Sequence, residues 1–298
     1  MKEITILSGK GGTGKTTVTA SFAALAEKRV LVDGDVDAAN LYMITPHKVL
    51  EEYPFQGGAL PKIDIEKCTH CGECIERCRF DALEKGPRLN RIACEGCGVC
   101  AHFCPEGAIT MEPRVCGTWF RSETDNGPMI HARLGIAEEN SGLLVSLLRR
   151  EAKAAAEAQG ANLILVDGPP GIGCPVISAT TGCDAVVVVT EPTLSGMHDL
   201  ERVAELTRFL NVPAMVTINR WDIHPIMAER IRDLALEKGL FHLGDIPVDE
   251  SVTKAMVDGK PLVSCSDGPA AKAIRGVWEQ VVTQLEKTNN PMLKMATS

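Results

Sequence analysis

The sequence predicts an α/β fold: a mostly parallel sheet with helices on both faces, interrupted by a small, cysteine-rich α+β module. Short apolar runs alternate with helical patterns through most of the 298 residues, as expected for strands buried on both faces. A glycine-rich loop joins the first run directly to the first helical pattern. The module is marked by eight of the twelve cysteines, which fall in two tight groups where the alternation stops.

The elements of the main sheet are expected in a regular order. The first strand covers residues 4–7 and leads through the glycine-rich loop into a helix over 15–27. Each later strand is followed by a turn and a helical pattern, which favours parallel pairing. The further strands are expected at 30–32, 163–166, 185–189 and 214–218, with an edge strand at 241–243 and a closing helix at 272–285.

The region from Gly57 to Pro113 interrupts this order. Cysteine, glycine and charged residues replace the apolar runs, and the segment 68–82 is repeated at 94–108. Glycines and a proline mark its entry. We therefore expect a discontinuous main domain made of residues 1–56 and 114–298, with an inserted module at 57–113.

Composition narrows the class of protein. The formal net charge of −8 argues against nucleic-acid and anionic-membrane binding, and the aromatic content of 4% argues against base stacking. The N-terminus resembles a strand rather than a secretory signal, and no apolar run is long enough to cross a bilayer. We expect a cytoplasmic protein, where clustered cysteines indicate metal rather than disulfides.

Residues 9–17 match the phosphate-binding pattern G-x-x-x-x-G-K-[ST], after a strand and before a helix as the pattern requires. The glycines let backbone N–H groups point into one concavity, and the helix N-terminus adds positive potential. Lys15 would reach the β- and γ-phosphates of ATP, and Thr16 would bind Mg²⁺. A glycine-rich turn without nucleotide is the alternative. The predicted ATP-binding residues of the loop are Gly11, Gly12, Thr13, Gly14, Lys15, Thr16 and Thr17.

The loop carries a second lysine, Lys10. Its sequence Gly-Lys-Gly-Gly-Thr-Gly-Lys-Thr-Thr resembles the deviant Walker A motif of the MinD/ParA/Mrp and nitrogenase iron-protein superfamily. The resemblance implies that Lys10 crosses to the nucleotide of a partner subunit in an ATP-sandwich dimer, where it would stabilise charge on the γ-phosphate. A solvated loop lysine is the alternative. The catalytic residues implied are Lys10, Lys15 and Asp35.

Three aspartates follow expected strands. Residues 31–37 resemble the switch I segment of the superfamily, in which Asp33 would hold the Mg²⁺ shell and Asp35 would orient or activate the attacking water. Residues 163–171 resemble the Walker B strand and switch II, with Asp167 in an outer-sphere Mg²⁺ position. The Mg²⁺ residues are therefore expected to be Thr16, Asp33 and Asp167. An aspartate at a strand end can also merely cap a turn.

Two later segments resemble the adenine-binding loops of the superfamily. Asn219 and Arg220 follow an expected strand, where relatives place an asparagine against the base. Pro247 and Asp249 lie in a later loop that would cover the other side of the base. Simple polar turns are the alternative at both places.

The two cysteine runs, Cys-x2-Cys-x2-Cys-x3-Cys, match the bacterial two-cluster ferredoxin pattern, in which the fourth cysteine of each run binds the other cluster. Zinc is the rival metal for paired Cys-x2-Cys motifs. In the first run Arg79 replaces the usual proline after the fourth cysteine, which removes no ligand. The pattern implies one [4Fe–4S] cluster on Cys68, Cys71, Cys74 and Cys104, and a second on Cys94, Cys97, Cys100 and Cys78.

Four cysteines lie outside the runs. Cys183 and Cys265 are expected to be ordinary small residues. The position of Cys174 just beyond the switch II turn resembles that of a cysteine in the nitrogenase iron protein that binds a cluster shared across the dimer. Such a site would need a second thiol, and Cys116 is the candidate. A structural cysteine is the default interpretation.

The whole combination resembles MinD-type P-loop ATPases that contain an inserted ferredoxin domain. This resemblance implies a nucleotide-dependent homodimer, or a heterodimer with a related ATPase, that couples ATP hydrolysis to electron transfer or metallocluster maturation on a partner protein. One alternative is an Fe–S scaffold or carrier ATPase. Another is a MinD/ParA-like positioning ATPase with a redox-sensing module, although residues 284–298 lack a basic amphipathic helix for membrane attachment.

Overall fold

The computed structural model describes residues 1–125, 127–135, 138 and 141–288. Residues 289–298, part of the segment considered above for membrane attachment, lie outside this description. The chain forms two compact units. The main unit comprises Met1–Glu52, Trp119–Arg133 and Asn140–Ser298, and the cysteine unit comprises Tyr53–Thr118 and Leu134–Glu139. The cysteine unit thus contains the expected module and extends beyond it on both sides.

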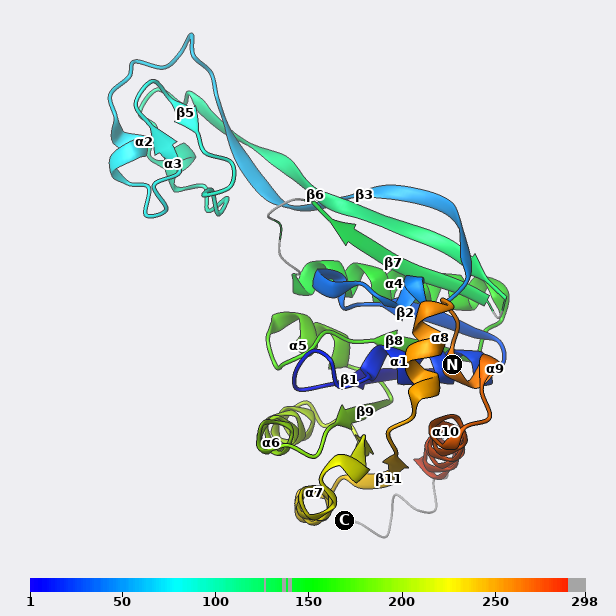
Figure 1. Cartoon of the computed structure of the whole chain (residues 1–298). Coiled ribbons are helices and arrows are strands. Elements are labelled where there is room, and N and C mark those ends of the chain that lie inside the picture. Colours follow the sequence, from blue (N-terminus) through cyan, green and yellow to red (C-terminus); the bar gives the residue numbers. More distant parts are fainter. Residues whose placement is uncertain (126, 136–137, 139–140, 289–298) are drawn as a thin grey trace. The chain divides into compact units, whose positions relative to one another are not determined.

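A nine-stranded sheet confirms the predicted α/β class, with the strand order β11-β10-β9-β1-β8-β2-β7-β6-β3 (Figure 1). The central strand β1 pairs in parallel with β8 and β9, and β2 pairs in parallel with β8 and β7. The predicted edge strand lies at one edge, parallel to β10. The strands are β1 (Lys2–Leu7), β2 (Arg29–Asp33), β3 (His47–Ile63), β6 (Ile109–Thr124), β7 (Gly127–Leu134), β8 (Leu163–Asp167), β9 (Ala185–Thr190), β10 (Ala214–Asn219) and β11 (Phe241–Ile246).

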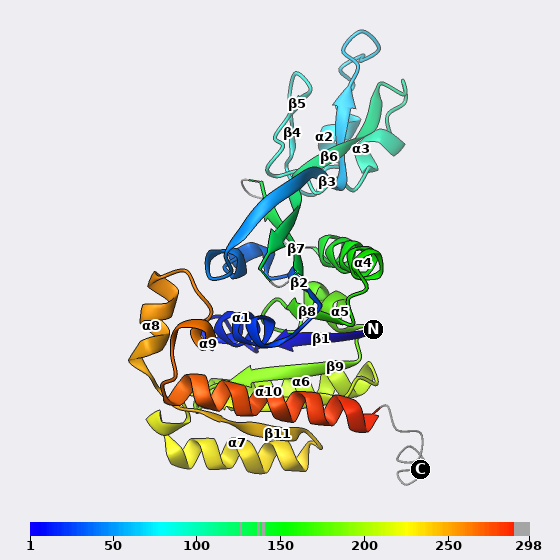
Figure 2. The same cartoon turned by 90° about the vertical axis from the view of Figure 1, so that its right-hand side faces the viewer.

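Helices cover both faces of the main sheet. On one face α1, α9 and α10 pack together, and Figure 2 shows α1 and α10 side by side. On the other face α5, α6 and α7 supply the apolar side chains that meet the strands, and α4 packs on α5 and β2. No described helix is long and apolar enough to cross a membrane. The helices are α1 (Lys15–Leu25), α4 (Gly142–Gln159), α5 (Cys174–Thr180), α6 (Leu194–Phe209), α7 (Pro225–Glu237), α8 (Glu250–Val257), α9 (Leu262–Cys265) and α10 (Pro269–Thr288).

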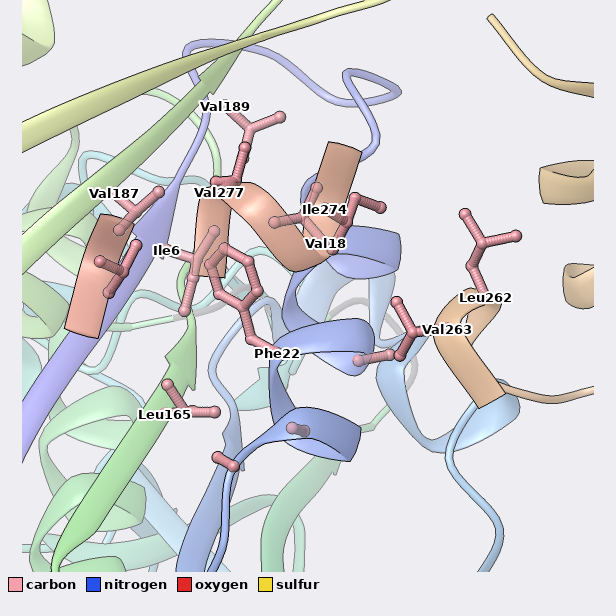
Figure 3. Packing of buried hydrophobic residues seen from close by; sticks show 14 of the residues in the cluster. Ile6, Val18, Phe22, Leu165, Val187, Val189, Leu262, Val263, Ile274 and Val277 are labelled. Atoms are coloured by element: carbon pink, nitrogen blue, oxygen red, sulfur yellow. The ribbon is translucent and has the colours of Figure 1, made fainter. Parts of the chain in front are cut away.

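The continuous apolar runs of the strands build two cores, because alternate residues of a strand point to opposite faces. In β9, Val187 and Val189 join the core beneath α1 and α10, whereas Val186 and Val188 join the core beneath α5, α6 and α7. Phe22 of α1 lies at the centre of the first core (Figure 3), and its ring centroid is 5.0 Å from that of Trp278. This packing fixes α1, and with it the glycine-rich loop that precedes the helix.

The cysteine unit is held by short, local elements. Helices α2 (Glu73–Glu76) and α3 (Val99–His102) occupy equivalent places in the two repeats, and each follows a left-handed glycine, Gly72 and Gly98. Glycine suits both positions, because a positive φ strains other residues. A two-stranded antiparallel hairpin, β4 (Leu83–Glu84) with β5 (Arg88–Leu89), separates the repeats.

The strands β3, β6 and β7 were not predicted, and β3 and β6 illustrate the reason. Their sequences contain glycines, prolines and exposed charged residues, which indicate turns when read locally. The two strands are neighbours in the sheet, so each satisfies the backbone groups of the other. In the polar, turn-rich stretch that follows, β6 ends at Thr124 and β7 begins at Gly127.

A buried histidine lies where β7 crosses the main unit. His131 is 6% exposed, and its Nε2 lies 2.8 Å from Oγ of buried Ser122. The ring of Phe120 stacks on it at 4.9 Å. Burial, with smaller contributions from His47 and Arg133, lowers the pKa of His131 to about 4.

This histidine predicts acid sensitivity of the main unit. A group whose folded pKa is depressed takes up protons preferentially in the unfolded chain, so stability is full above pH 6.5 and is lost as the pH falls towards 4. The loss should reach roughly 2–3 kcal/mol. Urea unfolding between pH 7 and pH 4 measures it. His131→Gln should flatten the profile while His198→Gln, at an exposed position of α6, leaves it unchanged; equal profiles for all three proteins would contradict the assignment.

Candidate functional site

A cavity of about 580 Å³ lies at the carboxyl ends of the strands in the main unit, within the roughly 300–1,000 Å³ typical of small-molecule sites. This edge is where parallel α/β sheets bind ligands. Most of the predicted ATP-binding residues line this cavity. They are Gly11, Gly12, Gly14, Lys15, Thr16, Thr17, Asn219, Arg220, Pro247 and Asp249, together with the predicted catalytic residue Asp35.

The shape of the glycine-rich loop depends on one close approach. Gly14 has φ 90°, and a Cβ there would lie 2.3 Å from Nδ2 of Asn219. That same Nδ2 donates to the carbonyl oxygen of Thr13 at 2.8 Å. Asn219 at the end of β10 therefore holds the loop, in addition to lining the cavity. Thr13 itself is buried and does not line the cavity.

Below the cavity floor, the buried carboxylate of Asp167 contacts side chains at the start of helix α1, next to the glycine-rich loop. Lys15 Nζ lies 2.9 Å from Asp167 Oδ1 and 3.3 Å from Asp35 Oδ2. The hydroxyl of Thr16 donates to Asp167 Oδ2 at 2.9 Å, and that of Thr19 donates to Asp167 Oδ1 at 2.8 Å. The structure thus brings together Lys15, Thr16, Asp35 and Asp167. Thr19 escaped the sequence analysis because it lies outside the phosphate-binding pattern.

The charges of this group do not balance. Burial and the neighbouring Asp167 raise the pKa of Asp33 well above its usual range, against the opposing effect of Lys15. Burial likewise raises the pKa of Asp35. Burial alone would lower the pKa of Lys15, but the carboxylates of Asp167 and Asp35 outweigh it and the pKa is raised. One ammonium thus faces three buried carboxyl groups.

This imbalance fits a divalent cation. Asp33 is fully buried, and its Oδ1 has no hydrogen-bond partner in the part of the chain that the structure describes. Carboxylate, hydroxyl and water oxygens are the ligands that Mg²⁺ prefers. The donor set of Thr16, Asp33 and Asp167 is therefore of the right chemistry for Mg²⁺.

Lys10 lies apart from the phosphate-binding lysine. It is partly exposed, its Nζ donates to Ser195 Oγ at 3.1 Å, and it lies 3.6 Å from Glu191 Oε2. The other oxygen of Glu191 accepts from Arg220 at 2.5 Å. Glu191 thus bridges Lys10 and Arg220 in this conformation. The sequence does not predict the contacts of Glu191, because this residue follows β9 without belonging to a motif.

The end of the cavity at Pro247 and Asp249 combines predicted and unpredicted residues. Asp249 lines the cavity, yet its Oδ1 accepts from Ser251 N and its Oδ2 from Ala270 N, so that it caps α8 and fixes the start of α10. Apolar side chains missed by the sequence analysis form much of the wall, because scattered apolar residues carry no motif. They include Met43, Ile44, Val248 and Met256.

In the cysteine unit, the eight cysteines of the two runs divide between two cavities. A cavity of about 420 Å³ is lined by Cys68, Cys71, Cys74 and Cys104. A smaller one, of about 20 Å³, is lined by Cys94, Cys97, Cys100 and Cys78. The fourth cysteine of each run, Cys78 or Cys104, therefore lies with the first three of the other run.

The thiol spacing distinguishes the possible metals. No three of the described cysteine, histidine, aspartate and glutamate side chains lie close enough together to hold one metal ion. A single zinc ion needs such a group, whereas the thiolates around a [4Fe–4S] cube are held apart by the cube. Burial and the thiols of Cys68, Cys71 and Cys104 raise the pKa of Cys74. A cationic iron core would relieve this repulsion, so the four-thiol sets fit [4Fe–4S] clusters.

The remaining cysteines have separate surroundings. The thiol of Cys116 is buried in the cysteine unit and donates to the carbonyl oxygen of Gly57 at 3.0 Å. Cys174 is exposed at the first position of α5 in the main unit. Cys183 is buried and Cys265 is exposed. A further cluster on Cys116 and Cys174 stays a prediction.

Comparison with known proteins agrees with this geometry. The family model of the CobQ/CobB/MinD/ParA nucleotide binding domain matches residues 4–262. An uncharacterized protein of Methanocaldococcus jannaschii is 31% identical, over 94% of this chain and 96% of its own length. An iron-sulfur cluster carrier protein of Pyrococcus abyssi is 23% identical, over 96% of this chain and 87% of its own length. The structure of the septum site-determining protein MinD of Pyrococcus horikoshii, complexed with Mg-ADP, has a similar fold, with a TM-score of 0.57, 20% identity, and coverage of 94% of this chain and 95% of that one.

Substitutions of the two lysines of the loop should impair different steps, ATP turnover for Lys10 and nucleotide binding for Lys15. Lys10→Ala should reduce stimulated ATP turnover at least about 100-fold, by analogy with an arginine finger, while nucleotide binding is largely kept. Lys15→Ala should lose nucleotide affinity itself, since Lys15 lines the cavity. Steady-state ATPase assays and fluorescent-nucleotide titration measure the two effects.

Lys287→Ala, which removes an exposed ammonium near the end of α10, is the matched control and should change neither quantity. Normal turnover in Lys10→Ala would refute the trans role of this lysine. Unchanged affinity in Lys15→Ala would mean that the nucleotide binds elsewhere.

Proposed function

Because the chain belongs to the CobQ/CobB/MinD/ParA family of nucleotide-binding proteins, we propose that it is an ATP-hydrolysing iron–sulfur protein. In this proposal, nucleotide-driven rearrangement of a dimer is coupled to electron transfer, or to metallocluster maturation, on a partner protein. The observation that carries the proposal is the presence in one chain of a nucleotide-sized cavity and two separate sets of four cysteines, each around its own cavity.

The residues of the main unit divide the work of ATP hydrolysis. The backbone of residues 11–14 and Lys15 would hold the phosphates, with Asn219 keeping the loop in place. Asp35, beside Lys15 at the cavity wall, would orient the attacking water and accept its proton. Mg²⁺, held by Thr16 and the carboxylates beneath it, would neutralise charge on the phosphates as they separate. Asp33 and Asp167, both fully buried, would supply these carboxylates.

Lys10 would act across a dimer. In the single chain it contacts Ser195 and Glu191, so it must leave them to reach a second nucleotide. A γ-phosphate on the partner would compete with Glu191 for this ammonium. We assign the dimer to two copies of this chain or to this chain with a related ATPase.

The cysteine sets would form the second functional part. We place the ATPase domain at residues 1–56 and 114–298 and the cluster-binding module at 57–113. A [4Fe–4S] cluster, when bound, supplies a one-electron centre. The chain would hold one cluster with Cys68, Cys71, Cys74 and Cys104 and the other with Cys94, Cys97, Cys100 and Cys78.

A scaffold or carrier of Fe–S clusters is the second candidate. It is favoured by the likeness to the Pyrococcus abyssi carrier protein and by the exposure of one cysteine in each set, Cys71 and Cys97. An exposed ligand can be exchanged with a partner more readily than a buried one. Retention of both clusters through nucleotide turnover distinguishes electron transfer from delivery.

Coupling between the two parts predicts a redox effect of nucleotide. If nucleotide affinity differs between the oxidised and reduced protein, linkage requires Mg-ATP to move the cluster potential. A tenfold difference in affinity corresponds to about 59 mV for a one-electron couple. Anaerobic EPR titration with and without Mg-ATP measures this shift, and Lys15→Ala is the control that should abolish it. Unmoved potentials would argue against coupling in the isolated protein.

The division of the cysteines predicts which substitutions remove iron. In a chain carrying Cys97→Ala, only the set completed by Cys104 should keep its cluster, at about four iron atoms per chain. Adding Cys104→Ala should then remove the remaining iron, whereas adding Cys78→Ala should change little. Iron analysis and EPR of the two double variants give the answer. The reverse pattern would show that each run binds its own cluster.

A further inference from the structure

A second cavity in the main unit, of about 150 Å³, has no part in the function proposed above and shares no lining residue with the nucleotide cavity. Helix α1 contributes one wall and the chain after α8 another. The polar and charged side chains that line it are those of Arg29, Thr45, Thr124, Asp125, Lys260 and Ser264.

Arg29 is a buried cation that forms no ion pair with any carboxylate of the described residues. It is the first residue of β2 and is 2% exposed. Its Nε donates to the carbonyl oxygen of Ala23 at 2.6 Å, near the end of α1, and its Nη1 reaches Thr124 Oγ1 only at 3.5 Å. A guanidinium has five N–H donors, so these contacts leave most of the fork unused. Within the described residues no acidic group lies within ion-pair distance of it, and burial lowers the pKa of Arg29 to about 10.

Thr45 provides an independent sign of a missing ligand. Its side chain is 4% exposed and lines the cavity, yet its Oγ1 has no hydrogen-bond partner among the residues described. A buried hydroxyl without a partner is costly, because it loses its hydrogen bonds to water. A ligand with acceptor oxygens would satisfy both this hydroxyl and the free N–H groups of Arg29.

We propose that this cavity binds a phosphate group, either as inorganic phosphate or as the end of a phosphate monoester. Arginine forks match the paired oxygens of phosphate, and Lys260 adds a second positive charge at the cavity. The volume exceeds the share of one water, about 30 Å³, so a tetrahedral anion can enter. Asp125 is exposed at the rim and opposes an anion, which leaves the site selective rather than indiscriminate.

The test uses the full-length, anaerobically purified chain with its nucleotide cavity saturated by Mg-AMPPNP, a non-hydrolysable ATP analogue whose γ-phosphate fills the place that the glycine-rich loop would otherwise offer to the probe. Calorimetric titration with inorganic phosphate, at an ionic strength matched with sodium chloride, should show one site per chain. Thr45→Val should weaken binding about tenfold, as expected for one hydrogen bond to a charged group, without lowering the Tm. Lys260→Gln should weaken binding and Asp125→Asn should tighten it.

Control variants and a second phosphate compound show whether binding occurs at this cavity and which kind of phosphate it accepts. Lys272→Gln removes an exposed ammonium of α10 that does not line the cavity and should bind phosphate as the wild type does. Arg29→Leu should abolish binding, and if it does not fold, Thr45→Val and Lys260→Gln decide. Glycerol 2-phosphate binding as well as phosphate would identify a monoester site, and phosphate alone an inorganic-ion site. No binding heat with Mg-AMPPNP bound, or wild-type affinity in both Thr45→Val and Lys260→Gln, would overturn the proposal.

Discussion

The carboxylate of Asp167 is the interaction on which the main unit depends. It ends β8 beside Asp33 of β2 and Ile6 of β1, so three parallel strands meet at its backbone. Its side chain accepts from Thr16 and Thr19 and pairs with Lys15, all on helix α1. A carboxylate buried without such partners would be strongly destabilising. Because its partners are also those of the nucleotide cavity, the same group that positions the helix places the loop.

The contacts of Asp167 hold the site together, but they leave its negative charge only partly balanced. Lys15 offsets part of the charge of Asp33, Asp35 and Asp167, but one ammonium cannot neutralise three carboxylates. The remaining negative charge is an attraction for a cation, while the loop amides above it attract phosphate. A cation at the carboxylates and a phosphate at the loop amides would therefore lie next to each other. The cysteine unit follows a different rule, since its short helices and hairpin bury little and its eight thiols line two cavities.

How much could be predicted from the sequence differs between these two kinds of structure. Local patterns predicted the strands β1, β2, β8, β9, β10 and β11, the glycine-rich loop and the two cysteine runs, because each depends on spacing within one segment. Partners supplied by distant segments were missed. The strand β3 pairs with β6, and β6 pairs with both β3 and β7, although the glycines and prolines of β3 and β6 favour turns. Glu191, Thr19 and Met43 reach the nucleotide cavity or its lysines through the fold, and nothing in their own neighbourhood marks them.

The central place of β1 has a consequence for how the chain is made. Strands β8 and β9, which flank it, begin only at Leu163 and Ala185. At about 5–20 residues per second, a ribosome needs roughly ten to thirty seconds to supply them after β1 has emerged. During that interval a strand that is almost wholly buried in the folded protein has two unpaired edges, and the cysteine runs emerge before it is covered. Synthesis of this protein therefore exposes an unpaired central strand and eight clustered thiols at the same time, before the sheet that covers the strand exists.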